Sequence, residues 1–184
     1  YIVGGTAAVS AAVQRDLGAI TGSWMKRVAG TDRYETARLV ALEFFNHREF
    51  CTVASGENGA LPDQIVAANA AAHMNGPMLL TTRHVLSNAT HNYFSLRGAS
   101  EVTTIGGSFA GIVTGGLRDT TGLRSIGHVG GSDRTATSVN VLRTYWGQRP
   151  ENIVYMPRDS FWDIAAVGQM GAMWDVPVVL SKAT

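Results

Sequence analysis

The feature that most constrains this chain is an internal repeat with a period of about 100 residues. The segment Gly30–Ala37, with the sequence GTDRYETA, returns as GSDRTATS at Gly131–Ser138, 101 positions later. Each copy leads into apolar residues at positions i, i+3, i+4, i+7 and i+8, the spacing of one helix face. Solenoid repeats are only about 20–50 residues long, so this period predicts small domains in tandem.

Further matches carry the repeat along the rest of the chain. The segments Ile2–Thr6 and Pro77–Leu80 match Thr104–Ser108 and Pro177–Leu180 at nearly the same spacing. These matches divide the chain into the C-terminal part of one repeat (1–26), a complete repeat (27–127) and the N-terminal half of the next (128–184). The chain is therefore expected to be a piece of a longer array. Its half-repeats are expected to pack against other copies, against the rest of the protein, or against each other.

Short apolar runs alternate with helical patterns inside the complete repeat. Strands are expected near 26–29, 51–54, 78–81 and 102–105, and helices over about 33–47, 62–74, 86–96 and after Ser108. This alternation predicts an α/β fold with parallel sheets flanked by helices. The strand runs lack polar alternation, as expected for strands covered on both faces. We expect 78–80 to be central in its sheet and 102–105 to lie beside a neighbour. Small residues in the second helix predict close backbone packing.

Composition narrows the functional classes. Lys and Arg number 15 against 14 Asp and Glu, which leaves no bulk positive field for nonspecific nucleic-acid binding. No apolar run approaches the roughly 20 residues of a membrane-spanning helix. The single cysteine, Cys51, excludes an intramolecular disulfide and is expected to be a small buried side chain. The five histidines show no metal-binding spacing, and no nucleotide-binding glycine motif is present, so neither a metal nor a cofactor is indicated.

The two copies of the GxDR motif place the same chemistry at two predicted helix starts. Asp32 and Asp133 suit the N-cap position, and Glu35 completes a capping-box pattern after Asp32. Arg33 and Arg134 would place a cation in the first turn, where it opposes the helix dipole. A partner must therefore compensate each arginine. Either a carboxylate of the next repeat or a phosphate or carboxylate of a ligand would do so.

Other residues extend this candidate site. Arg27 is expected to flank the Arg33 site, and His128 is its weaker counterpart in the next repeat. Trp162, at a loop-to-helix junction, is a candidate platform for stacking on sugar rings. Asp63 and Asp163 stand at predicted helix N-termini, where a negative charge is favoured for structural reasons.

One short segment is close to a catalytic motif. Gly106–Ala110 approximates the G-x-S-x-G turn that presents a nucleophilic serine, here Ser108. The sister copy has Thr6 at this position, and a threonine suits a helix N-cap better than a nucleophile. No catalytic residue is therefore expected, although a Rossmann-like hydrolase using Ser108 stays an alternative.

Taken in order, these motifs resemble the type 2 cell wall-binding repeats of Gram-positive surface proteins. The residues that carry the resemblance are Arg27–Gly30, Asp32–Ala37, Asp63, Pro77–Thr81 and the glycine pairs 4–5 and 106–107. The third copy departs from the pattern, because His128 and Thr135 replace Arg27 and Tyr34. The resemblance implies Rossmann-like, flavodoxin-like modules in a threefold ring that anchor an extracellular protein to the wall.

The leading functional hypothesis is a noncatalytic module that binds an anionic cell wall polysaccharide or secondary wall polymer. Arg27, Arg33, Arg134 and Trp162 are the predicted binding residues, and other repeats of the same protein are the predicted protein partners. A surface-layer assembly module is the second alternative to this hypothesis. Recurrence of the motifs favours binding over catalysis, because a polymer gains affinity from several weak sites held at high effective concentration.

Overall fold

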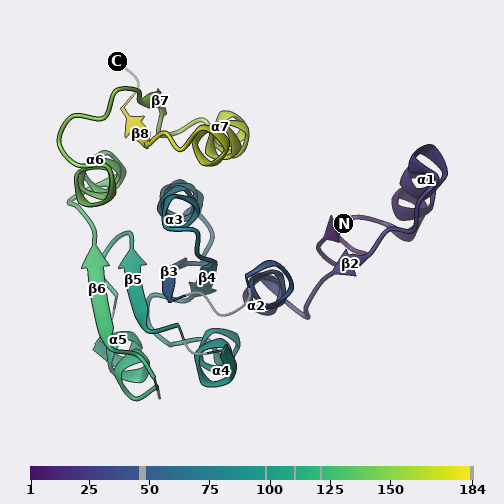
Figure 1. The fold of residues 1–184 in the computed structure, drawn as a ribbon, viewed down its shortest axis with the longest axis horizontal. Helices are drawn as coiled ribbons and strands as arrows, with labels where there is room; N and C mark the ends of the chain where they lie inside the picture. The colour runs from purple at the N-terminus through teal and green to yellow at the C-terminus, as the bar shows by residue number, and fades with distance from the viewer. Residues whose placement is uncertain (46–48, 98, 110, 121, 183–184) are drawn as a thin grey trace.

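Strands and helices alternate along the whole chain (Figure 1). The computed structural model describes residues 1–45, 49–97, 99–109, 111–120 and 122–182, and in the last helix it omits the side chains of residues 161, 162, 164 and 165. The strands are β1 (Ile2–Val3), β2 (Arg27–Val28), β3 (Phe50–Ser55), β4 (Met78–Thr81), β5 (Glu101–Ile105), β6 (Ser125–Val129), β7 (Val154–Pro157) and β8 (Val178–Ser181). The helices are α1 (Ala11–Thr21), α2 (Arg33–Phe44), α3 (Leu61–His73), α4 (Asn88–Arg97), α5 (Gly111–Arg118), α6 (Arg134–Tyr145) and α7 (Phe161–Trp174).

Every strand pair in the described chain is parallel, which confirms the predicted α/β class. The central sheet has the strand order β4-β3-β5-β6, and two-stranded pairs, β1-β2 and β7-β8, lie on either side of it in the sequence. The prediction that residues 78–80 form a central strand is wrong. β4 lies at the edge, and β3 and β5 occupy the middle. The apolar run of β4 reflects cover by packed helices, since α2 lies against it.

The β1-β2 pair and the central sheet each join strands on both sides of a boundary between sequence repeats. β5 pairs with β6, the first strand of the following repeat, with Thr104 opposite His128 and Ile105 opposite Val129. β1 and β2 pair in the same way, with Ile2 opposite Arg27 and Val3 opposite Val28. The expectation that 102–105 lies beside a neighbour is confirmed. A repeat therefore contributes its first strand to the preceding sheet and receives one from the next.

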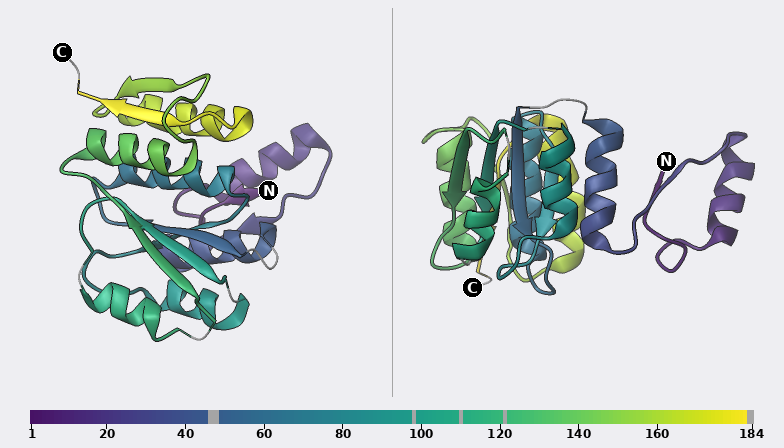
Figure 2. Two further views of the ribbon diagram at one scale, coloured as in Figure 1. Left: turned by 60° about the vertical axis from the view of Figure 1, so that its left-hand side comes forward. Right: turned by 90° about the horizontal axis from the view of Figure 1, so that it is seen from below.

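Helices cover both faces of the central sheet (Figure 2). On one face, α2, α4 and α5 enclose a core that includes Cys51, Val53, Tyr93, Phe94 and Leu117. Cys51 is fully buried, which confirms that expectation, and burial raises the pKa of its thiol. No helix in the described ranges is long and apolar enough to cross a membrane.

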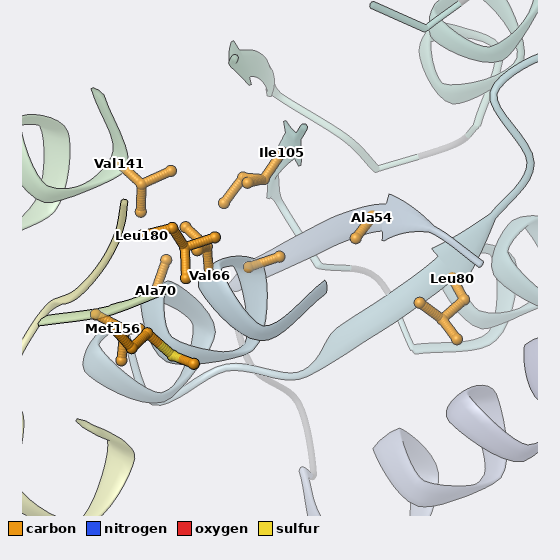
Figure 3. Close-up of a cluster of buried hydrophobic side chains, with 10 residues drawn as sticks. Ala54, Val66, Ala70, Leu80, Ile105, Val141, Met156 and Leu180 are labelled. Atoms are coloured by element: carbon orange, nitrogen blue, oxygen red, sulfur yellow. The ribbon is translucent and has the colours of Figure 1, made fainter. Parts of the chain in front are cut away.

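The core on the other face is shared by two repeats. Figure 3 shows Val66 and Ala70 of α3 gathered with Val141 and Leu180, which come from α6 and β8 of the next repeat. Small residues permit the close approach predicted for these helices. A Cβ at Gly168 of α7 would lie only 2.8 Å from Cγ2 of Ile65 on α3. A side chain at position 168 would therefore collide with α3 unless Ile65 moved.

A buried amide also joins α3 to the next repeat. The Oδ1 atom of Asn69 accepts a hydrogen bond from the backbone N–H of Val178 at 3.0 Å, and Nδ2 donates to the carbonyl of Val176 at 3.1 Å. Nearby, Nδ1 of His73 lies 2.6 Å from Oδ1 of Asp175, and the His73 ring lies against Trp146. Asn69 therefore provides hydrogen-bond partners for two backbone groups of the next repeat.

We expect Asn69→Ala to destabilise the protein by about 2 kcal/mol, because each buried backbone group left without a partner costs about 1–3 kcal/mol. The measurement is urea unfolding followed by circular dichroism. Asn92→Ala, an exposed substitution on α4, is the matched control and should change the free energy of unfolding by less than about 0.5 kcal/mol. Equal stability of the two variants would show that the Asn69 amide contributes nothing at this junction.

Candidate functional site

Helices α2 and α6 begin with the same capping contact. Asp32 is the N-cap of α2, and its Oδ1 atom accepts a hydrogen bond from the N–H of Glu35 at 2.8 Å. Asp133 caps α6 in the same way through the N–H of Ala136 at 2.8 Å. Glu35 directs its carboxylate to Arg38 along the helix, so its side chain does not turn back to the cap. The two caps set the direction in which the following arginines leave their helices.

Arg33 lies against the loop that follows β3. Its Nη1 atom donates hydrogen bonds to the carbonyl of Gly56 at 2.7 Å and to Oδ1 of Asn58 at 3.0 Å. Both acceptors are neutral, and Arg33 forms no ion pair with the described residues. The side chain is exposed. Arg33 is therefore a positively charged group in contact with neutral acceptors.

Arg134 connects two repeats. Its Nη1 atom lies 3.4 Å from Oδ1 of Asp159 in its own repeat, a pair with the same sequence separation as Arg33 and Asn58. Its Nη2 atom donates to the carbonyl of Gly59 in the preceding repeat at 2.9 Å. Of the two partners expected from the sequence, a carboxylate is present, although it belongs to the same repeat. Asp159 lies between two arginines, since its Oδ2 atom is 3.7 Å from Nε of Arg158.

The structure adds two arginines that the sequence motifs did not indicate. Arg83, after β4, lies 3.6 Å from Oδ2 of Asp63 and 4.0 Å from Oε2 of Glu57. Arg158, after β7, pairs with Oδ2 of the capping Asp133 at 3.0 Å. All four arginines follow strand ends or helix starts at the carboxyl edge of the parallel sheets, where ligands bind in open α/β folds. That rule, applied to the residues that follow the ends of β4 and β7, is the signal that would have found them.

Asp63 is the most buried acidic group at this edge. Its side chain is 8% exposed, and Oδ1 has no hydrogen-bond partner within the described residues. Burial raises the pKa of this carboxyl, while the positive charge of Arg83 opposes the shift. The left-handed Gly106 passes close to it, since a Cβ there would lie 3.0 Å from Oδ2. Asp63 therefore packs the turn after β5 against the start of α3.

The remaining predicted residues lie elsewhere. Arg27 donates hydrogen bonds to the carbonyls of Gly4 and Val9 and to the side chain of Gln14, so it holds the loop between β1 and α1. His128, its counterpart, contacts Oγ1 of Thr104 through Nδ1 at 3.0 Å. The Trp162 side chain is outside the described residues. The structure thus brings Arg33, Arg134 and Arg83 around one loop, 56–60, and places Arg27 on a different one.

Ser108 has no catalytic surroundings in the described part of the chain. Its side chain is exposed in the turn after β5, and no hydrogen bond joins it to a described histidine or carboxylate. The recurring acid Asp63 pairs with Arg83. This geometry gives a nucleophilic role for Ser108 no support.

We expect Asp63→Asn to raise the melting temperature at pH 7. The folded-state pKa of Asp63 lies above its unfolded value, so the stability it contributes is present below the unfolded pKa and is lost as pH rises through the folded pKa. An amide of the same shape removes the cost of burying the charge. Thermal melts from about pH 4 to 8 should show the advantage shrinking towards acid.

Asp163→Asn, at the exposed counterpart on α7, is the control and should show a smaller difference at every pH. A lower melting temperature for Asp63→Asn at pH 7 would mean that the pairing with Arg83 outweighs burial.

Comparison with known proteins places these features in a family. Residues 27–111, slightly less than half of the chain, match the Cell wall binding domain 2 (CWB2) family. N-acetylmuramoyl-L-alanine amidase LytC of Bacillus subtilis (strain 168) is 30% identical over 145 residues, which are 77% of this chain and 27% of that protein. The chain therefore spans about a quarter of the length of that relative.

Two solved structures share the fold over 98% of this chain. Cwp6 from Clostridium difficile superposes with a TM-score of 0.87 at 22% identity, over 29% of its own length. Cwp8 from the same organism gives a TM-score of 0.82 at 23% identity, over 31% of its length. At this identity the likeness concerns the fold alone. The family match begins at Arg27 and contains the motifs of the complete repeat, so residues 27–111 of this chain are similar to the Cell wall binding domain 2 family.

Proposed function

We propose that this chain is a noncatalytic module that anchors a surface or secreted protein to the cell wall by binding an anionic wall polymer. The match of residues 27–111 to the Cell wall binding domain 2 family supports the wall as the target. The arginines at the carboxyl edge of the sheets support an anionic ligand. The proposal places the module outside the cell, where such polymers are found.

The observation that carries the proposal is the position of Arg33 and the charge of the groups that it contacts. It lies in the first turn of a capped helix, is exposed, and among the described residues its hydrogen-bond acceptors are all neutral. A helix N-terminus favours an anion through its free N–H groups and its dipole. A guanidinium can hold a phosphate or carboxylate by two hydrogen bonds, and Nη2 and Nε of Arg33 have no hydrogen bond within the described residues. Arg33 is therefore the strongest anion contact we propose.

Arg134 supports a second, weaker contact one repeat later. It occupies the same place on α6, but Asp159 lies 3.4 Å from its Nη1 atom. A ligand anion there has to compete with that carboxylate. Since the net charge of the chain is only +1, attraction to an acidic polymer has to be local. Several weak sites along a repeat array would bind one polymer tightly through effective concentration.

Similarity to the amidase does not favour a catalytic function for this chain. Its enzymatic activity belongs to a protein about four times longer than the matched segment. Ser108 has no described acid or base in contact, and the recurring Asp63 is held in a buried structural position. We therefore propose binding without turnover. Incubation of this chain with purified walls should leave the turbidity of the suspension unchanged.

We expect Arg33→Ala to weaken co-sedimentation with purified Gram-positive cell walls by about tenfold, the loss that follows from one charge-assisted contact. Arg134→Ala should weaken binding less, because Asp159 already shares its charge. Arg15→Ala, which removes one exposed positive charge on α1, is the matched control and should bind like the wild type. Asp32→Ala should lower the melting temperature through the lost cap, while the folded fraction still binds.

Two results would contradict this site. If Arg33→Ala melts early and the protein that remains folded still binds normally, Arg33 serves only to hold loop 56–60 and the ligand lies elsewhere. If Arg15→Ala weakens binding as much as Arg33→Ala, the attraction depends on total charge and not on a site.

We expect wall binding by the unmodified chain to fall as salt rises from about 0.05 to 0.5 M, because screening shortens the reach of an exposed charge. Walls stripped of their acidic secondary polymers should bind much less protein than intact walls in the same sedimentation assay. Equal binding to stripped and intact walls, with no salt dependence, would exclude an anionic polymer as the ligand.

A further inference from the structure

The dipeptide Asn-Gly occurs twice in the chain, at Asn58-Gly59 and at Asn75-Gly76. Asparagine is a chemically labile residue, and a following glycine makes it most reactive because the next backbone nitrogen carries no side chain beside it. That nitrogen attacks the side-chain carbonyl carbon, ammonia leaves, and a cyclic succinimide remains. The reaction needs a nitrogen without a partner and a backbone with room to bring it to the side chain. The fold therefore decides which of the two pairs reacts.

Asn58 and Gly59 are the central residues of an exposed turn in loop 56–60. The N–H of Ala60 donates to the carbonyl of Glu57 at 3.1 Å and closes the turn, and Gly59 has a φ of +85°. A positive φ at the third position of a turn favours glycine. Both central residues are exposed, and the N–H of Gly59 donates no hydrogen bond within the described residues. The attacking nitrogen is therefore available at this turn.

Asn75 and Gly76, which follow α3, are held in a closed arrangement. Asn75 has a φ of +52°, and the N–H of Gly76 donates to the carbonyl of Ala71 at 2.8 Å. Gly76 is buried, and a Cβ on it would lie 2.3 Å from the carbonyl oxygen of Phe50. The attacking nitrogen already has a hydrogen-bond partner, and the backbone beside it has no room to rotate. The fold therefore protects the second Asn-Gly pair.

Arg33 favours the reaction at Asn58. Its Nη1 atom donates a hydrogen bond to Oδ1 of Asn58 at 3.0 Å. When the nitrogen of Gly59 attacks, the negative charge of the tetrahedral intermediate develops on that same oxygen. A positively charged donor already aimed at the atom where charge develops lowers the free energy of such an intermediate. The residue that we propose to bind the wall polymer thus also promotes a chemical change in its own neighbour.

We propose that Asn58 is a site of spontaneous deamidation, and that the change weakens the anion contact at Arg33. A bond forms between the nitrogen of Gly59 and Cγ of Asn58, the Cγ–Nδ2 bond breaks, and the amide proton leaves with ammonia. Water then opens the succinimide at either carbonyl and produces an aspartate or an isoaspartate. Both products carry a carboxylate, so loop 56–60 gains one negative charge. Water is the only co-reactant.

The next repeat shows the contact that the new carboxylate would make. Asp159 is the counterpart of Asn58, and its Oδ1 atom lies 3.4 Å from Nη1 of Arg134. Deamidation of Asn58 therefore gives Arg33 the kind of acidic partner that Arg134 has. This consequence rests on the proposed function, in which Arg33 binds the polymer, whereas the deamidation itself does not. Affinity for the wall falls as the chain ages.

The modification is tested by incubating the purified, folded chain in mildly alkaline buffer and mapping its peptides by mass spectrometry. Both Asn-Gly pairs lie on one tryptic peptide, residues 49–83, so fragment ions assign the change to one or the other. Asn58 should convert several times faster than Asn75. In urea the two rates should become similar, because unfolding removes the protection of Asn75. Equal rates in the folded chain, or no conversion of Asn58, would overturn the proposal.

Co-sedimentation with purified walls measures the consequence. Asn58→Asp should weaken binding about two- to fivefold, the range that one exposed ion pair corresponds to. Asn75→Asp adds the same charge at the opposite end of α3 and should bind like the wild type. The next repeat already carries aspartate at both positions, Asp159 and Asp175, so the fold accommodates each substitution. Thermal melts of both variants verify this.

Incubated wild type should lose affinity in step with the conversion of Asn58. Asn58→Gln should keep the affinity that it has when fresh, because the longer side chain cyclises far more slowly. An equal loss in Asn58→Gln would show that another change is responsible. Should Asn58→Asp melt early, this comparison of aged with fresh protein replaces it.

The outcomes separate this inference from the proposed function. If Arg33→Ala weakens wall binding and Asn58→Asp does not, the charge at position 58 has no effect, so the inference is wrong and the proposed function stands. If neither substitution weakens binding, the proposed site is wrong and the consequence drawn for deamidation is wrong with it.

Discussion

The packing of α3 between two repeats is the contact on which the rest of the structure depends. One side of this helix covers the central sheet, and the other is buried against α6, α7 and β8 of the following repeat. Alanine at positions 67, 70 and 71 and glycine at 168 and 171 bring the backbones close enough for one continuous core. Because this core belongs to both repeats, the face of α3 that is turned to the next repeat is buried only where the two repeats pack together.

The exchange of a strand across each boundary follows from the same arrangement. β6 completes the sheet of one repeat and leads directly into α6, the first helix of the next. The N-terminus of α6 is therefore held at the carboxyl edge of the preceding sheet. This places Arg134 against Gly59 of one repeat while its own loop supplies Asp159. A junction between repeats, and not the interior of one repeat, is where the charged groups of the candidate site converge.

The two equivalent arginines, Arg33 and Arg134, differ in the charge of the groups that they contact. Arg33 contacts a carbonyl and an amide, which orient the guanidinium without neutralising it. Arg134 contacts a carboxylate, which lowers the free energy available from an additional anion. The difference arises in the loop after the second strand of each repeat. This loop carries the neutral Asn58 in one repeat and the acidic Asp159 at the equivalent position of the next. Sequence similarity between copies therefore does not imply equal affinity, and the array is expected to hold its ligand through unequal sites.

The sequence by itself determined the order of the elements and the resemblance to the cell wall-binding repeats, because the repeat spacing, apolar runs and GxDR motifs are local patterns. It placed Asp32 and Asp133 before the helices that they cap, since a cap depends only on residues within one turn. It did not show that β4 is an edge strand, because an apolar run indicates cover on both faces and not position in a sheet. The sequence also did not indicate that Arg83 and Arg158 lie at this edge, or that Arg27 and Arg33 contact different loops. Those relations depend on which loops meet at the carboxyl edge, and only the packing of one repeat against the next decides that.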